Sequence, residues 1–245
     1  PVSGFVPPEA IKVTSQGRNR QPVFVSDKSF IFVSESRGQH KDPQLYFRDL
    51  EENKEKRITH QRGHLANGFF LDESGHIFYS STTDEEKEAP YVLKNYIDRY
   101  PTSVKNDSFF QADFAPQEIY KSRIDGTEIQ RITEHPGFDG FPTYLAAKKH
   151  LYFSRWDNGK ISIYAKSLLR TLAPWKVTTT SGHDLGLKIS PNSKNFVWSR
   201  FSPDFRSAQI LSAGIDMKNP DYVTLDSGVS WTPTWHPNGK TVIYS

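Results

Sequence analysis

The sequence predicts an all-β protein, specifically a β-propeller built of four-stranded antiparallel blades. Five short apolar runs end in serine, at Ser34, Ser80, Ser154, Ser199 and Ser245. These serines lie 46, 74, 45 and 46 residues apart, so one repeat carries an insertion of about 28 residues. A repeat of this length that consists of short strands is typical of a radial propeller, in which each repeat forms one blade.

Three other positions keep the same register as the serines. A strand is expected to open twelve residues before each serine, at Pro22, Gly68, Pro142, Leu187 and Pro233. Runs that end in threonine lie 8 or 9 residues before those positions, at Thr14, Thr59, Thr133, Thr178 and Thr224. A third apolar run begins 14 or 15 residues before four of these threonines, at Leu45, Ile119, Ile163 and Ile210. The repeat therefore predicts four strands per blade, named a to d in chain order.

The pattern predicts four complete blades, from about residue 20 to 225, with partial blades at both ends. Residues 10–14 have the position of an outer strand d, and the last residues have the positions of strands a and b. We interpret residues 1–245 as a single propeller domain, with an insertion at about 84–116 in the second complete blade. We expect the natural protein to continue past Ser245 and to form a five- or six-bladed propeller.

Composition limits the classes of function. The chain has 31 Lys and Arg against 28 Asp and Glu, and the net charge of +3 does not indicate a nucleic-acid partner. The absence of cysteine excludes disulfides and thiolate chemistry. No apolar stretch approaches the 18 residues of a transmembrane segment. The chain begins at Pro1 without a signal-like region, so we expect that a leader was removed or never included.

The turns and strands of the repeat resemble a known family. The segments that show the resemblance most clearly are His236-Pro237-Asn238-Gly239-Lys240, Ser190-Pro191-Asn192-Ser193-Lys194, and Asp125-Gly126 followed by Arg131-Ile132-Thr133. This pattern resembles the TolB-like propeller repeats, which are also described as WD40-like. The resemblance implies a binding module of the bacterial cell envelope, periplasmic or secreted. It also implies a protein or peptide partner, with a peptidoglycan-associated lipoprotein as the partner of TolB itself.

The segments between strand d and the next strand a should surround the mouth of the central channel. Each contains a glycine: Gly17, Gly63, Gly137, Gly182 and Gly228. The varied residues beside these glycines are the predicted ligand-binding residues: Arg18, Asn19, His64, Asp139, His183, Asp184 and Ser230. The oxygens of Asn19, Asp139, Asp184 and Ser230 could coordinate a hard cation such as calcium in the channel, or hydrogen-bond a peptide from a partner. The alternative is that Asp and Asn only cap their own loops by local backbone bonds.

The insertion leaves the second complete blade between Ser80 and Ile119, on the same face as the channel mouth. It begins with the charged run Asp84-Glu85-Glu86-Lys87-Glu88. Its aromatic residues are unusual for a disordered loop. A short helix is expected over 90–100, and the insertion could pack on the blades as a lid or present its aromatics to a partner. The predicted partner-binding residues are Tyr91, Tyr96, Tyr100, Phe109 and Phe110.

No catalytic motif is present in the sequence. Gly228-Val229-Ser230-Trp231-Thr232 lacks the final glycine of a nucleophile elbow, and no phosphate-binding loop or zinc-protease motif occurs. The main hypothesis is therefore a non-catalytic protein- or ligand-binding module. Two alternatives stay open: the substrate-gating propeller of a prolyl-oligopeptidase-like serine peptidase, and a glycan-binding or glycan-hydrolysing propeller that uses Asp139 and Asp184.

Overall fold

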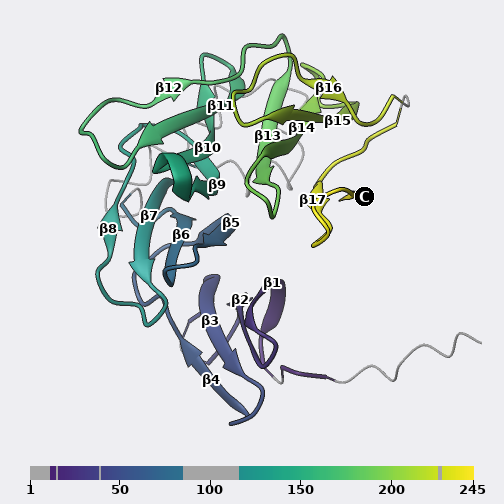
Figure 1. The fold of residues 1–245 in the computed structure, drawn as a ribbon. Coiled ribbons are helices and arrows are strands. Elements are labelled where there is room, and N and C mark those ends of the chain that lie inside the picture. The colour runs from purple at the N-terminus through teal and green to yellow at the C-terminus, as the bar shows by residue number, and fades with distance from the viewer. Residues whose placement is uncertain (1–11, 15, 39, 85–115, 226–227) are drawn as a thin grey trace, which may run out of the picture. The chain divides into compact units, whose positions relative to one another are not determined.

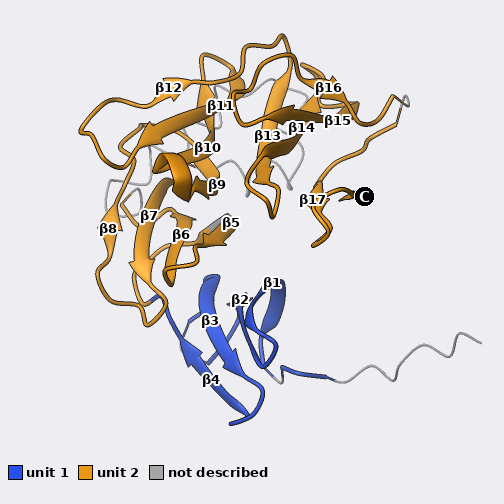
Figure 2. Cartoon of the chain, viewed as in Figure 1, with its two compact units in different colours: residues 1–59 blue, residues 60–245 orange. Residues whose placement is uncertain are grey.

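A computed structural model describes residues 12–14, 16–38, 40–84, 116–225 and 228–245. The chain divides into two compact units, residues Pro1–Thr59 and His60–Ser245, which have different colours in Figure 2. The aromatic residues predicted to bind a partner, from Tyr91 to Phe110, lie outside the described residues.

The described chain forms four-stranded antiparallel sheets, which confirms the predicted fold class (Figure 1). Blade 1 consists of β1 (Arg18–Ser26), β2 (Ser29–Glu35), β3 (Gln44–Asp49) and β4 (Lys54–Arg57). Blade 2 consists of β5 (Leu65–Leu71), β6 (His76–Ser81), β7 (Glu118–Arg123) and β8 (Gln130–Arg131). Blade 3 consists of β9 (Asp139–Leu145), β10 (His150–Asp157), β11 (Lys160–Ser167) and β12 (Trp175–Lys176). Blade 4 consists of β13 (His183–Ile189), β14 (Asn195–Phe201), β15 (Ala208–Gly214) and β16 (Asp221–Tyr222).

The remaining elements are short. A 3-10 turn, η1 (Ala146–Lys148), links β9 to β10. The pair β17 (Thr234–Trp235) and β18 (Val242–Ile243) forms a two-stranded sheet at the places that the repeat gives to strands a and b. Residues 12–14, which the repeat assigns to an outer strand, form no strand. An outer strand forms only by pairing with a third strand, and no described residue supplies that partner here.

The repeated threonines follow the outer strands and fasten them to the third strands. Each threonine Oγ1 accepts a hydrogen bond from the N–H of the first apolar residue of the third strand, at 2.9, 2.9, 3.0 and 2.9 Å in blades 1 to 4. In blades 1 and 4 the same hydroxyl donates to the glutamine directly before that apolar residue, Gln44 or Gln209. We call the third-strand polar residue and this threonine the polar corner of a blade.

The first strand of every complete blade contains a β-bulge at the repeated Pro, Gly or Leu position. Gln21, Phe141 and Gly186 have positive φ directly before that position, and Gly68 has positive φ at it. A bulge increases the local twist and changes which face the following side chains occupy. The register of the first strand of each blade therefore could not be read from simple alternation.

Within the larger unit, the core consists of apolar clusters between neighbouring blades. Tyr152 of blade 3 meets Phe196 of blade 4 with ring centroids 4.8 Å apart, and Trp198 belongs to the same fully buried cluster. Phe78 of blade 2 stacks on Tyr144 of blade 3 at 5.0 Å. Aromatic side chains fill the space between flat sheets and add edge or offset contacts to their buried area. These contacts fix blades 2, 3 and 4 side by side.

The recurring glycine of the segments before strand a has more than one structural reason. A Cβ on Gly17 would lie 2.6 Å from the Glu35 carbonyl oxygen, and one on Gly182 would lie 2.0 Å from that of Phe201. Gly17 and Gly63 also have positive φ. Gly228 has neither feature. The predicted close approach or positive φ is thus confirmed at Gly17, Gly63 and Gly182 and is wrong at Gly228.

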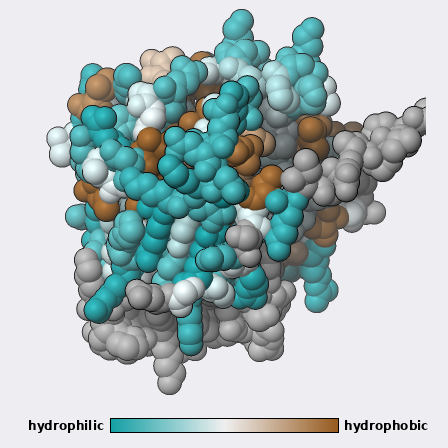
Figure 3. Space-filling model, turned by 90° about the horizontal axis from the view of Figure 1, so that it is seen from below, coloured by the Kyte–Doolittle hydropathy of each residue, from teal (hydrophilic) through white to brown (hydrophobic). Residues whose placement is uncertain are grey.

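Exposed apolar side chains are dispersed over the part of the surface that the described residues form. The face drawn in Figure 3 is mainly hydrophilic, and its apolar atoms form separate patches. Exposed apolar side chains such as Phe24, Leu169 and Leu225 are scattered along the chain, as on most protein surfaces. In the described ranges, no helix has the length and hydropathy needed to cross a bilayer.

Candidate functional site

Two predicted ligand residues, Asp139 and Asp184, occupy equivalent places in blades 3 and 4. Asp139 opens β9 opposite Arg155, whose Nε and Nη2 lie 2.7 and 2.6 Å from the two carboxylate oxygens. Asp184 pairs with Arg200 at 2.8 and 3.1 Å in the same way. Both aspartates are fully buried. Each carboxylate is therefore engaged within its own blade.

His183 is held as a neutral ring inside blade 4. Its Nδ1 accepts from the Ile161 N–H at 3.1 Å, and its Nε2 lies 3.2 Å from the Pro203 carbonyl oxygen, to which it donates. The ring stacks on Phe205 with centroids 3.9 Å apart. Burial lowers the pKa of His183. Between blades 2 and 3, the Gln117 N–H donates to a backbone carbonyl oxygen, that of Gly137. At the same repeat position between blades 3 and 4, the Ile161 N–H donates to the His183 ring instead.

The four other predicted mouth residues each make a contact within their own unit. His64 is exposed, and its backbone pairs with Thr82. Ser230 is buried, and its N–H donates to the Ala208 carbonyl oxygen at 3.0 Å. Arg18 and Asn19 belong to the smaller unit, where Arg18 pairs with Glu35 at 3.1 Å and Asn19 bonds to Thr14 at 2.9 Å. Their binding role stays a prediction.

The base of the insertion lies beside two mouth segments. On its near side, the Thr82 N–H donates to the His64 carbonyl oxygen at 3.0 Å. On its far side, Gln117 pairs in parallel with Phe138: its N–H donates to the Gly137 carbonyl oxygen at 3.2 Å, and its carbonyl oxygen accepts from the Asp139 N–H at 2.9 Å. The insertion therefore leaves and returns between the segments that enter blades 2 and 3.

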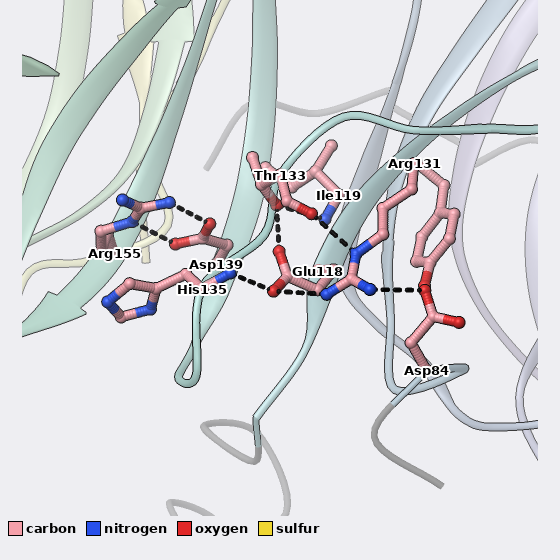
Figure 4. A network of polar contacts seen from close by, with 9 residues as sticks. Asp84, Glu118, Ile119, Arg131, Thr133, His135, Asp139 and Arg155 are labelled. Atoms are coloured by element: carbon pink, nitrogen blue, oxygen red, sulfur yellow. Dashed lines mark hydrogen bonds and ion pairs between the residues drawn. The ribbon is translucent and has the colours of Figure 1, made fainter. Parts of the chain in front are cut away.

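A buried carboxyl, Glu118, lies at this base (Figure 4). Its oxygens accept from the Thr133 hydroxyl, the His135 N–H and Arg131 Nη2, the last at 3.1 Å. Burial raises the pKa of Glu118 to about 7; the Asp139 carboxylate adds to this rise, and the three donors oppose it. Glu118 is therefore a carboxyl that changes its charge close to neutral pH.

Arg131 links Glu118 to the last described residue before the insertion. Its Nη1 lies 3.2 Å from Asp84 Oδ2, which also accepts from the Tyr120 hydroxyl. His135 lies beside the network (Figure 4). Burial lowers the pKa of His135, and its buried Nδ1 has no hydrogen-bond partner among the described residues. The Arg131 guanidinium therefore couples the charge on Glu118 to Asp84, at the base of the insertion.

The sequence interpretation missed Glu118, Arg131 and Arg155. A signal for Glu118 was present, because it occupies the place of Gln44 and Gln209 in the repeat and is the acidic member of that set. A signal for the ion pairs was present too. Asp139 and Arg155 are separated by 16 residues, and so are Asp184 and Arg200.

The donor set does not fit a calcium ion at the predicted mouth residues. Asp139 and Asp184 are each neutralised by an arginine of the same blade. Within the ranges that the structure describes, no three His, Asp or Glu side chains come together as metal ligands do. Calcium needs six to eight oxygens, which these residues do not supply together.

Comparison with known proteins gives a fold and no sequence family. No family model matches the chain, and no curated protein matches it by sequence. Among solved structures, TolB from Acinetobacter baumannii is similar with a TM-score of 0.66 and 18% identity. That match covers 94% of this chain and 49% of the TolB chain, so the chain spans about half of that relative.

Two enzymes have similar propellers. Oligogalacturonate lyase from Vibrio parahaemolyticus matches with a TM-score of 0.63 and 11% identity, over 94% of this chain and 59% of the lyase. A puromycin hydrolase matches with a TM-score of 0.64 and 11% identity, over 95% of this chain and 36% of the hydrolase. Likeness at this identity defines the fold alone.

The sheets and the comparisons together define an all-β protein of the β-propeller class. Within that class, the chain has a TolB-like fold, as the repeat indicated.

Proposed function

We propose that this chain is a non-catalytic binding module of the bacterial cell envelope, which holds a protein partner on the face where the insertion emerges. The observation that carries the proposal is the hydrogen bonding of the insertion's base to the mouth segments at His64 and at Gly137–Asp139. A partner that contacts the insertion would therefore also meet the channel mouth. The TolB likeness supports a protein partner and a periplasmic location.

The chemistry of the mouth supports binding over catalysis. Acid–base catalysis needs a carboxyl within reach of a substrate proton. Asp139 and Asp184 are fully buried, and each is held by two hydrogen bonds from one guanidinium. Their role in this proposal is to stiffen the first strands beneath the mouth.

The test is calorimetric binding of a purified peptidoglycan-associated lipoprotein without its lipid. Replacement of residues 85–115 by a short Gly-Ser linker should weaken binding at least about tenfold, because aromatic residues dominate most interface energies. The control is Leu169→Ser with Leu172→Ser, two exposed residues that follow strand c of blade 3, on the opposite face. Equal binding by the shortened chain and the wild type would sink the proposal.

One alternative has an observation in its favour. The puromycin hydrolase propeller matches almost as well as TolB, with TM-scores of 0.64 and 0.66. On that alternative, the chain gates substrate access to a hydrolase domain. A reading frame that encodes such a domain after residue 245, with peptide hydrolysis by the whole protein, would favour it over the binding module. The likeness to the lyase relates to the other alternative, a glycan-binding or glycan-hydrolysing propeller. A glycan array with the wild-type chain tests that alternative.

A further inference from the structure

A cavity of about 320 Å³ lies at the opposite ends of the first strands from the mouth segments. It is formed by the ends of β5, β9 and β13 and by β17, together with the turns that follow some of these strands. Its walls include the apolar residues Phe70, Tyr144, Ile189 and Trp235, and it contains one lysine, Lys188. A volume of this size is at the lower end of the range for small-ligand pockets.

The aromatic walls are held in place. Tyr144 stacks on Phe78 at 5.0 Å, and Trp235 donates from Nε1 to the Lys188 carbonyl oxygen at 3.3 Å. Phe70 packs against the apolar cluster between blades 2 and 3. Rigid aromatic surfaces of this kind bind flat or apolar groups at low entropic cost.

Lys188 is the lysine of the cavity lining. Its side chain makes no hydrogen bond or ion pair with another residue that the structure describes. Strand alternation puts it on the face opposite to Leu187 and Ile189, which pack between blades 3 and 4. Burial lowers the pKa of Lys188, and no carboxylate counteracts that effect. An ammonium on the half-buried wall of a cavity gains more from a bound anion than a fully solvated one does.

The acidic residues of the cavity do not serve as that partner. Asp72 uses Oδ1 to accept from the Ser74 N–H at 2.9 Å and the His76 N–H at 2.8 Å, in its own turn. Glu73 is exposed at the rim. The cavity lining therefore combines Lys188 with aromatic walls and with polar side chains such as Thr143, Ser190 and Ser193.

We propose that this cavity is a binding site for a carboxylate with an apolar or aromatic body, whose charge is met by Lys188 and whose body lies between Tyr144 and Trp235. The site is separate from the mouth face and does not depend on the function proposed above. The carboxylate could belong to a free organic acid or to the C-terminus of a peptide.

The test uses two pairs of probes that differ only in charge. They are 3-phenylpropionate with 3-phenylpropionamide, and acetyl-Gly-Phe with its C-terminal amide, measured by calorimetry at pH 7. At least one acid should bind saturably, and its amide should bind at least about tenfold more weakly. Binding of the small acid alone identifies a metabolite-like ligand, and tighter binding of the peptide acid identifies a C-terminus. Equal binding of acid and amide, or no saturable binding by either acid, would overturn the proposal.

Variants assign the effect to the lysine. Lys188→Met should reduce acid binding at least about tenfold while Lys188→Arg retains it. Lys194→Met is the matched control, since Lys194 is exposed in the turn after β13, and it should bind as the wild type does. In ¹⁵N-lysine spectra, the acid should raise the pKa of the Lys188 ammonium. Wild-type affinity in Lys188→Met, or an unchanged Lys188 signal at saturation, would contradict the proposal.

Discussion

In blades 1 and 4 the polar corner pairs a threonine with a glutamine, whereas in blade 2 it pairs a threonine with Glu118. The geometry is otherwise shared: Thr59 and Thr133 each accept from the third strand at 2.9 Å. Arg57 and Arg131 both donate from Nε to the carbonyl oxygen of that threonine, at 2.6 and 2.9 Å. One exchange of an amide for a carboxyl therefore adds charge to an unchanged scaffold.

Blade 2 differs from blades 3 and 4 at a second buried position. β5 and β6 place Leu65 opposite Ser81, where β9 and β10 place Asp139 opposite Arg155. The fold therefore tolerates either an apolar residue or an ion pair at this point. Both departures of blade 2 lie beside the insertion. The same two positions also vary elsewhere, because in blade 1 Asn19 takes the place of Asp139 and lies opposite Ser34, and in blade 3 Ser162 takes the place of the glutamine. The repeat therefore maintains the sheets while these two buried positions change from blade to blade.

The largest expected effect comes from breaking the Asp139–Arg155 ion pair of blade 3, which has no counterpart in blade 2. Arg155→Met leaves the buried carboxylate of Asp139 without its partner, and this should cost about 3–5 kcal/mol in the free energy of unfolding. Chemical denaturation at pH 7 measures the loss. The double variant Asp139→Leu with Arg155→Met imitates the apolar character of blade 2 and should recover most of it. A single variant as stable as the wild type would mean that the pair contributes nothing.

The second effect comes from giving blade 2 the amide of blades 1 and 4. The folded-state pKa of Glu118, about 7, exceeds the ordinary value of 4.5. Protonated Glu118 therefore favours the folded state, and the wild type should lose stability as pH rises from about 4.5 to 7. Glu118→Gln should remove this loss and stabilise the protein above pH 7 by about 3 kcal/mol at most.

The measurement for Glu118→Gln is the difference in unfolding free energy between variant and wild type across pH 4 to 9. The difference should grow up to about pH 7 and then level off. A difference that is constant with pH would show that Glu118 keeps an ordinary pKa. Gln209→Asn, in the corner of blade 4, is a control that should show no such pH dependence.

The third expected effect is a difference in the stability lost when the corner threonine of blade 2 or of blade 1 is replaced. Thr133→Val and Thr59→Val each leave a buried third-strand N–H without its acceptor, which costs about 1–3 kcal/mol. Thr133 also donates to a carboxylate, while Thr59 donates to Gln44. At pH 8 the blade 2 variant should therefore lose about 1 kcal/mol more, because hydrogen bonds to charged groups are stronger. Urea denaturation at pH 8 and pH 5 measures this, and an excess loss that persists at pH 5 would contradict it.

The sequence predicted the blades well because the repeat reports backbone geometry directly. The threonines recur because each hydroxyl must accept from the third strand, and the third-strand positions Leu45, Ile119, Ile163 and Ile210 are buried in every blade. Such requirements are local and identical in each blade. They therefore leave a pattern that one sequence is enough to reveal.

The site was harder to predict, since it depends on register across a bulge. Asp139 looked like a loop residue beside the mouth, but β9 is shifted so that Asp139 faces Arg155. A one-residue shift moves a side chain to the other face of a sheet, and nothing in the spacing of apolar residues announces it. The role of Glu118 could be inferred only after the corners of different blades were compared.

The smallest expected effect is the reverse exchange, in blade 1. Gln44→Glu places a carboxyl in a buried corner where Thr59 donates at 2.7 Å. Blade 2 has two further advantages for a carboxylate: the His135 N–H and Arg131 Nη2 both donate to Glu118. It also has one disadvantage, the nearby Asp139 charge, which raises the Glu118 pKa.

The two extra donors and the nearby Asp139 charge have opposite effects on a carboxylate, so their absence from blade 1 largely cancels. The Gln44→Glu variant should therefore lose only about 1–2 kcal/mol in the free energy of unfolding at pH 8, and less at pH 5, where the new carboxyl is protonated. The difference between the two pH values in chemical denaturation is the quantity to measure. If Gln44→Glu costs the same at both pH values, the new carboxyl has the same pKa in the folded and the unfolded protein. The raised pKa of Glu118 must then come from Asp139 and the insertion's base rather than from the corner geometry that blades 1 and 2 share.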